Sequence, residues 1–116
     1  MPDVEFSLPR LSAAEALARA AAGELVFLDL RKPAAAKESG ARIAGAEVRD
    51  PFAFDHSDPL MTAGHSIAVF CVHGHEVSRF GCALLRLHGR DAVFVEGGFE
   101  EMLAAGAPTI PIGAAE

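Results

Sequence analysis

Residues 67–80 read IAVFCVHGHEVSRF, and this stretch decides the class of fold. Its first six residues are apolar and rich in β-branched and aromatic types, which predicts a strand that is buried on both faces. After a short polar loop, an amphipathic helical pattern begins and runs to Gly89. The apolar positions of that helix are expected at Val77, Phe80, Gly81, Leu84 and Leu87. A buried strand that leads into a helix is half of a βαβ unit.

Further strands are expected on both sides of this unit. LVFLDL at 25–30 and AVFVE at 92–96 are short apolar runs, and a weaker strand is expected around residues 46–48. Residues 50–66 are rich in Pro, Asp, Ser and Gly, which is typical of a long loop.

Helices are expected between these strands. Ser12 and Glu15 form a capping-box pattern at the start of a helix that Gly23 ends. Residues 33–40 begin with Pro and end with Gly, and residues 99–106 carry glutamates near their start, so both predict short helices. Alternation of strands with helices predicts an α/β fold with a parallel sheet that helices cover on both sides.

Composition narrows the classes of function. The chain of 116 residues suits a single domain over residues 1–116, and its net charge of −6 argues against nucleic acid and against an anionic membrane surface as partners. No apolar run reaches the length of a membrane span, and the N-terminus has no basic start typical of a secretory signal. With two cysteines, too few for a disulfide framework, a cytoplasmic protein with reduced thiols is expected.

The octapeptide CVHGHEVS at 71–78 carries the chemistry. Cys71 lies near the carboxyl end of the predicted strand, where ligands bind in open parallel sheets. The start of the following helix offers unpaired N–H groups and partial positive charge, and a nearby thiol then has a lowered pKa. Gly74 permits a turn that points successive N–H groups at an anion, and His73 and His75 could add hydrogen bonds. These features favour a nucleophilic cysteine.

Each of these residues also has a structural interpretation. A cysteine beside a buried strand is often a small core residue, so on position alone Cys71 could be reactive or inert, whereas Cys82 falls within the helix and is expected to be structural. Asp29 and Arg31 are expected to form a structural ion pair at a strand end. Metal binding is a further alternative, because Cys71 and the two loop histidines alternate, but a fourth ligand is missing. No metal site is therefore predicted.

Five segments in order resemble the single-domain rhodanese family. They are LVFLDLRKP, ARIAGAEV, AVFCVHGHEVS, the helix that ends LLRLHG, and AVFVEGGFEEM. The resemblance covers residues 11 to 112 and implies a rhodanese-like fold, a sheet of about five parallel strands flanked by helices on both sides. It implies sulfur transfer without a cofactor: Cys71 takes a sulfane sulfur from a small anionic donor such as thiosulfate. The resulting persulfide passes to a thiol acceptor or to a protein partner, with ping-pong kinetics.

The same resemblance implies which residues bind substrate. They are the loop residues Val72, His73, Gly74, His75, Glu76 and Val77. The sequence departs from the family pattern at Glu76, where a basic residue is common, and at Met102, where Trp is usual. The segment ARIAGAEV also lacks the His and Pro of the family's Gly-His-Ile-Pro-Gly-Ala.

A carboxylate at position 76 would repel an anionic donor, so a catalytically weak binding or sulfur-carrier module is the alternative. Phosphatases of this fold need Cys-x5-Arg, and here that position is Val77.

Overall fold

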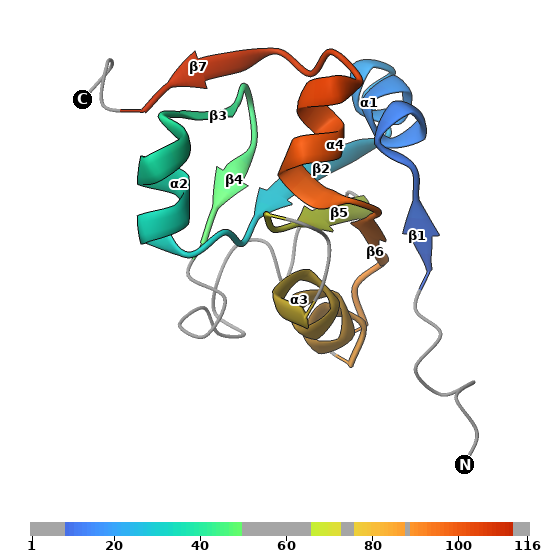
Figure 1. Ribbon diagram of the computed structural model, residues 1–116. Coiled ribbons are helices and arrows are strands. Elements are labelled where there is room, and N and C mark those ends of the chain that lie inside the picture. The colour runs from blue at the N-terminus through green and yellow to red at the C-terminus, as the bar shows by residue number, and fades with distance from the viewer. Residues whose placement is uncertain (1–8, 50–65, 73–75, 88, 113–116) are drawn as a thin grey trace.

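A single parallel sheet forms the centre of the molecule. The computed structural model describes residues 9–49, 66–72, 76–87 and 89–112, and of residues 76–79 it describes the backbone alone. The five strands lie side by side in the order β1, β6, β5, β2 and β4, and every neighbouring pair is parallel (Figure 1). Their bounds are Arg10–Leu11, Ala92–Val95, Ser66–Phe70, Leu25–Asp29 and Glu47–Val48, in that order. The predicted α/β class with about five parallel strands is confirmed.

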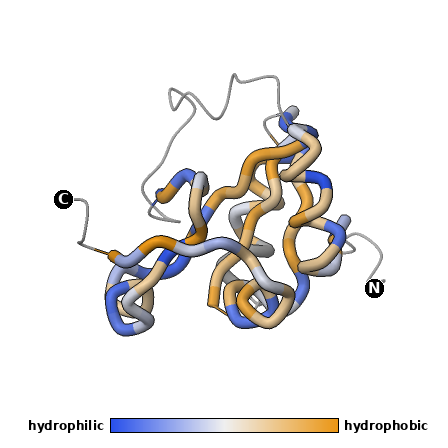
Figure 2. The backbone as a smooth tube through the Cα atoms, turned by 90° about the horizontal axis from the view of Figure 1, so that it is seen from above, coloured by the Kyte–Doolittle hydropathy of each residue, from blue (hydrophilic) through white to orange (hydrophobic). Residues whose placement is uncertain are grey.

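Helices cover both faces of this sheet. Their bounds are Ala13–Ala21 for α1, Pro33–Ser39 for α2, Glu76–Leu87 for α3 and Gly98–Ala104 for α4. The core cluster on one face joins α1 and α4 to the strands, and the cluster on the other face joins α3 to them. Figure 2 shows the hydrophobic strands running through the middle of the molecule. No helix in the described ranges has both the length and the apolar character needed to cross a membrane.

The start of α1 follows the predicted capping box. The Ser12 hydroxyl accepts a hydrogen bond from the Glu15 backbone N–H at 3.1 Å, and the Glu15 carboxylate accepts one from the Ser12 backbone N–H at 3.1 Å. Both N–H groups would otherwise lack a partner within the helix. The prediction that α2 ends at Gly40 is also confirmed, because Gly40 caps this helix with a φ of 75°.

The buried face of α3 agrees with the prediction at Gly81 and differs from it at Phe80 and Leu87. Phe80 is 48% exposed and Leu87 is 82% exposed, whereas Gly81, Cys82 and Leu85 are buried against the sheet. The helix therefore faces the sheet with Gly81, Cys82 and Leu85. A Cβ at position 81 would overlap the tip of the Leu30 side chain, so glycine permits a closer approach of helix to sheet than the larger apolar residues would.

Three strands were not expected from the sequence. β1 is the fifth strand of the parallel sheet, and its two residues pair with Phe94 and Val95 of β6. β3 (Ala41–Ile43) and β7 (Thr109–Pro111) form a separate antiparallel pair. The long loop predicted at residues 50–66 lies outside the described residues except for Ser66, which begins β5.

Candidate functional site

Cys71 is the first residue after β5, at the carboxyl end of the central strand of the sheet. Cys71 as a whole is 7% exposed. Hydrogen bonds hold the backbone on either side of the thiol. The carbonyl of Phe70 accepts from the Leu30 N–H at 2.9 Å, and the carbonyl of Cys71 accepts from the Phe99 N–H at 2.8 Å. The strand end is therefore fixed between the segment that follows β2 and the first turn of α4.

Two glycines bring α4 to this position. Gly97 and Gly98 follow β6 with φ values of 76° and 62°, a backbone region that glycine enters without steric cost. The chain thereby turns from β6 so that the first N–H groups of α4 face the end of β5. Besides Phe99, the Glu100 N–H donates to the Val72 carbonyl at 3.4 Å. The strand end thus satisfies donors that have no partner inside the helix.

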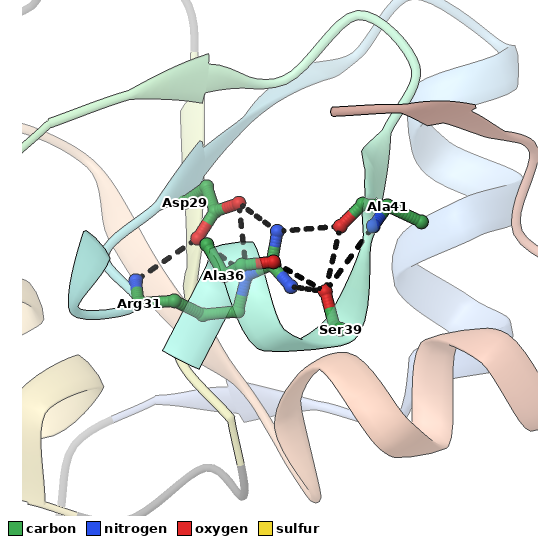
Figure 3. A network of polar contacts seen from close by, with 5 residues as sticks. All are labelled: Asp29, Arg31, Ala36, Ser39 and Ala41. Atoms are coloured by element: carbon green, nitrogen blue, oxygen red, sulfur yellow. Dashed lines mark hydrogen bonds and ion pairs between the residues drawn. The ribbon is translucent and has the colours of Figure 1, made fainter. Parts of the chain in front are cut away.

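A buried ion pair lies beside the strand end. The side chains of Asp29 and Arg31 are 2% and 1% exposed, and the Arg31 Nη2 lies 3.0 Å from the Asp29 Oδ2. Nε of the same guanidinium donates to both carboxylate oxygens at 3.1 Å, and Nη1 and Nη2 donate to the Ser39 hydroxyl and the Ala41 carbonyl, each at 3.0 Å (Figure 3). The Asp29 carboxylate also accepts from the Arg31 backbone N–H at 2.9 Å. The expected ion pair is confirmed, and its neighbours fix the guanidinium in one orientation.

The face of Phe99 connects this ion pair with the strand end. The Arg31 Cζ lies 3.9 Å from the centroid of the Phe99 ring, which is a cation–π contact. The same ring stacks on Phe70 with centroids 6.5 Å apart, and Phe27 meets Phe70 edge-on at 6.1 Å. Phe99 is not among the site residues expected from the sequence, although the Gly-Gly pair before it marked a sharp turn there.

A hollow of about 390 Å³ opens next to the strand end. It is lined by Arg31, Ala35, Glu38, Ser39, Val72, Phe99, Glu100 and Leu103. Two carboxylates, those of Glu38 and Glu100, lie along this hollow, and the Arg31 guanidinium there is paired with the buried Asp29.

The rest of the predicted loop cannot be placed in the same way. His73, Gly74 and His75 lie outside the described residues, as do the side chains of Glu76 and Val77, whose backbone begins α3. Four positions, 72–75, separate Cys71 from this helix. The cradle of loop amides therefore stays a prediction, and so does the metal alternative, which needs the two histidines.

Solved structures resemble this architecture at low sequence identity. A rhodanese-related protein from Thermoplasma volcanium matches with a TM-score of 0.70 and 22% identity, over 88% of this chain and 97% of that one. The rhodanese-like fold is the fold of this chain. A thiosulfate sulfurtransferase from Pseudomonas aeruginosa matches with a TM-score of 0.76 and 17% identity, over 90% of this chain but 20% of that longer one.

Another structural neighbour carries a different functional description. A protein of unknown function from Rhodopseudomonas palustris, named as a possible tyrosine phosphatase, matches with a TM-score of 0.77 and 21% identity, over 93% of this chain and 89% of that one. No protein-family model matches the sequence, and no curated protein matches it. The likeness therefore establishes the fold, and the chemistry has to be argued from the residues.

Cys82, the second cysteine of this chain, lies in the core between α3 and the sheet. Cys82 lies on the buried face of α3 with no exposed surface, and its thiol donates a weak hydrogen bond to the Ala92 carbonyl at 3.5 Å. Burial raises the pKa of this thiol to about 11, against the opposing effect of the Arg86 charge. Both cysteines are free thiols, so no disulfide joins them.

Proposed function

We propose that this protein is a rhodanese-type sulfurtransferase with Cys71 as its nucleophile. The observation that carries the proposal is the position of Cys71, one residue beyond the central parallel strand and just before α3. Ligands of open α/β sheets bind at this edge. The fold shared with a thiosulfate sulfurtransferase supports the choice of reaction.

The proposed reaction needs no redox co-reactant. The Cys71 thiolate attacks the outer sulfur of a sulfane donor such as thiosulfate. A new sulfur–sulfur bond forms, the old one breaks, and sulfite leaves with the bonding electron pair. A thiophilic acceptor then attacks the terminal sulfur of the persulfide and regenerates the thiolate, which gives ping-pong kinetics. Loop amides from Val72 to Val77 are proposed to hold the anionic sulfur.

The charge near the strand end supports a second candidate, a weakly catalytic sulfur-carrier or binding module. Glu38 and Glu100 line the hollow beside Val72, and the sequence adds Glu76 at the start of α3. A carboxylate at position 76 would repel a dianionic donor and slow its binding. Under this candidate, Glu76→Arg creates or strongly raises thiosulfate activity, and unchanged turnover in an already active protein would rule it out.

A phosphatase reaction is not proposed, despite the description attached to one structural neighbour. Phosphatases of this kind clamp the oxyanion with an arginine six positions after the cysteine. Here that position holds Val77, and the nearest arginine along the helix is Arg79.

The proposal is tested by thiocyanate formation from thiosulfate and cyanide. Wild-type protein is expected to turn over, and Cys71→Ser is expected to abolish turnover because no persulfide can form. Cys82→Ala is the matched control, since it removes the other thiol while leaving the strand end intact. Equal turnover of Cys71→Ser and wild type would refute the assignment of the nucleophile.

A further inference from the structure

We infer that Arg31 is a positioning residue for Cys71 and that it acts through the ring of Phe99. The inference rests on the proposed function for its consequence in sulfur transfer, but its geometry concerns the backbone that carries the thiol. It gives the ion pair of Asp29 and Arg31 a role in the site in addition to its structural role.

Two contacts connect the Arg31 guanidinium with Cys71. The Arg31 Cζ lies 3.9 Å from the centroid of the Phe99 ring. The backbone N–H of the same phenylalanine donates to the Cys71 carbonyl at 2.8 Å. Phe99 thus contacts the guanidinium through its side chain and forms a hydrogen bond with Cys71 through its main chain. A shift of the ring moves the donor of that hydrogen bond.

Hydrogen bonds hold the Arg31 guanidinium in one orientation. All three of its nitrogens donate hydrogen bonds, to Asp29, Ser39 and the Ala41 carbonyl, which come from β2, α2 and β3. A planar group fixed from three elements presents a fixed face to its aromatic neighbour. The ring of Phe99 therefore packs against a surface that cannot rotate away.

Arg31 is also linked to the end of β5 through Leu30, its neighbour in the sequence. Its preceding residue, Leu30, donates from its N–H to the Phe70 carbonyl at 2.9 Å. The carbonyls of Phe70 and Cys71 are thus held by Leu30 and Phe99, and Arg31 contacts or adjoins both donors. Buried ion pairs often contribute little net stability compared with apolar residues, so fixed geometry is the property this pair adds here.

The test compares two phenylalanines in the same core cluster, in a Cys82→Ala background so that one thiol remains. Both Phe27 and Phe99 contact the Phe70 ring, but only Phe99 contacts Arg31 and bonds to Cys71. Phe27→Leu and Phe99→Leu should lower Tm by similar amounts. The rate of Cys71 alkylation by iodoacetamide, measured across pH, should change about tenfold or more in Phe99→Leu alone, and Phe99→Trp should restore it.

A double-mutant cycle tests that Arg31 acts through the ring. Arg31→Lys keeps the charge next to Asp29 but removes the planar face, so it should change the alkylation rate in the same direction as Phe99→Leu. The double variant should be no further from wild type than the more affected single variant, because both changes break one path. Multiplying effects, or equal rates in Phe27→Leu and Phe99→Leu, would overturn the inference.

The outcomes separate this inference from the proposed function. If wild-type protein forms no persulfide but its alkylation rate follows the expected pattern, the proposed reaction fails and the positioning role stands. If wild-type protein transfers sulfur and Phe99→Leu alkylates like Phe27→Leu, the reaction stands and the positioning role fails.

Discussion

The two cysteines of this chain are both buried, but they lie in different parts of the unit that β5 and α3 form. Cys71 follows a strand at the edge where ligands bind, whereas Cys82 is enclosed between α3 and the sheet. Thiolate, rather than thiol, is the reactive form of cysteine. Burial that raises the pKa of Cys82 therefore removes it from the chemistry at neutral pH.

Selective alkylation follows from this difference. With a pKa of about 11, the thiolate fraction of Cys82 at pH 8 is on the order of one in a thousand. Iodoacetamide is therefore expected to label Cys71 first in the folded protein, as measured by peptide mass spectrometry. In denaturant the two thiols should react at similar rates. Faster labelling of Cys82 in the folded protein would contradict its structural role.

Stability at high pH depends on the same thiol. The pKa of Cys82 rises from 9.0 to about 11 on folding, so the folded state disfavours the thiolate. Its contribution is fully present below pH 9 and is lost as pH rises from 9 toward 11, by about 2–3 kcal/mol at most. Chemical denaturation at several pH values should show wild type losing more stability than Cys82→Ala over this range. Parallel curves would show that the thiol does not titrate with unfolding.

At the scale of elements, the contact between α3 and the residue that follows β2 depends on a glycine. A Cβ at Gly81 would overlap the tip of Leu30, which is fully buried. Overpacking costs about 1–3 kcal/mol, and alanine gains about 1 kcal/mol in helix propensity. Gly81→Ala is therefore expected to destabilise the fold by about 1 kcal/mol in urea denaturation.

A second substitution makes this prediction specific. Leu30→Val removes the atom that a Cβ at position 81 would overlap, so the double variant Gly81→Ala/Leu30→Val should be more stable than the sum of the two single effects predicts. Strict additivity would mean that the helix accommodates alanine by another route.

The sequence predicted the elements with strong local signals and missed the short ones. The capping box of α1 and the Gly ends of helices are local patterns, and they appear as expected. β1 has two residues, and β3 and β7 have three each, too few for a period to show, and each pairs with a strand that is distant in the sequence. For α3, Gly81 is buried as predicted, but the apolar Phe80 and Leu87 are exposed, because Cys82 and Leu85 pack against the sheet instead.

The candidate site was predictable in its position but not in its connections. Cys71 followed from an apolar run that ends in a polar loop before a helix. The contact of Arg31 with Phe99 joins residues 68 positions apart, and no local pattern encodes such a pairing. The residues that support the thiol therefore required the three-dimensional structure.

For the whole molecule, net charge predicts how an anionic donor approaches. The chain carries a charge of −6, and two glutamates line the hollow beside the strand end. Salt screens this repulsion, because the Debye length falls from about 30 Å at 0.01 M to about 8 Å at 0.15 M. The kcat/KM for thiosulfate should therefore rise over that range of ionic strength in a steady-state assay. A steep fall would indicate a local positive field that outweighs the net charge.

The rhodanese-like fold and the chemistry of this protein rest on different observations. Neighbours at 17–22% identity establish the arrangement of strands and helices. Function has to be carried by a site, since one fold supports several reactions. The proposed site is the Cys71 thiol that follows β5, together with the backbone hydrogen bonds that hold the residue.

The central claim is that Cys71 carries a sulfur atom during turnover. Its most direct test is the mass of the Cys71 peptide after incubation with thiosulfate and before any acceptor is added. The peptide is expected to gain the mass of one sulfur atom on Cys71, reversed by cyanide or by reductant, with Cys82 unmodified. An unchanged mass at Cys71 under conditions where the protein produces thiocyanate would contradict it.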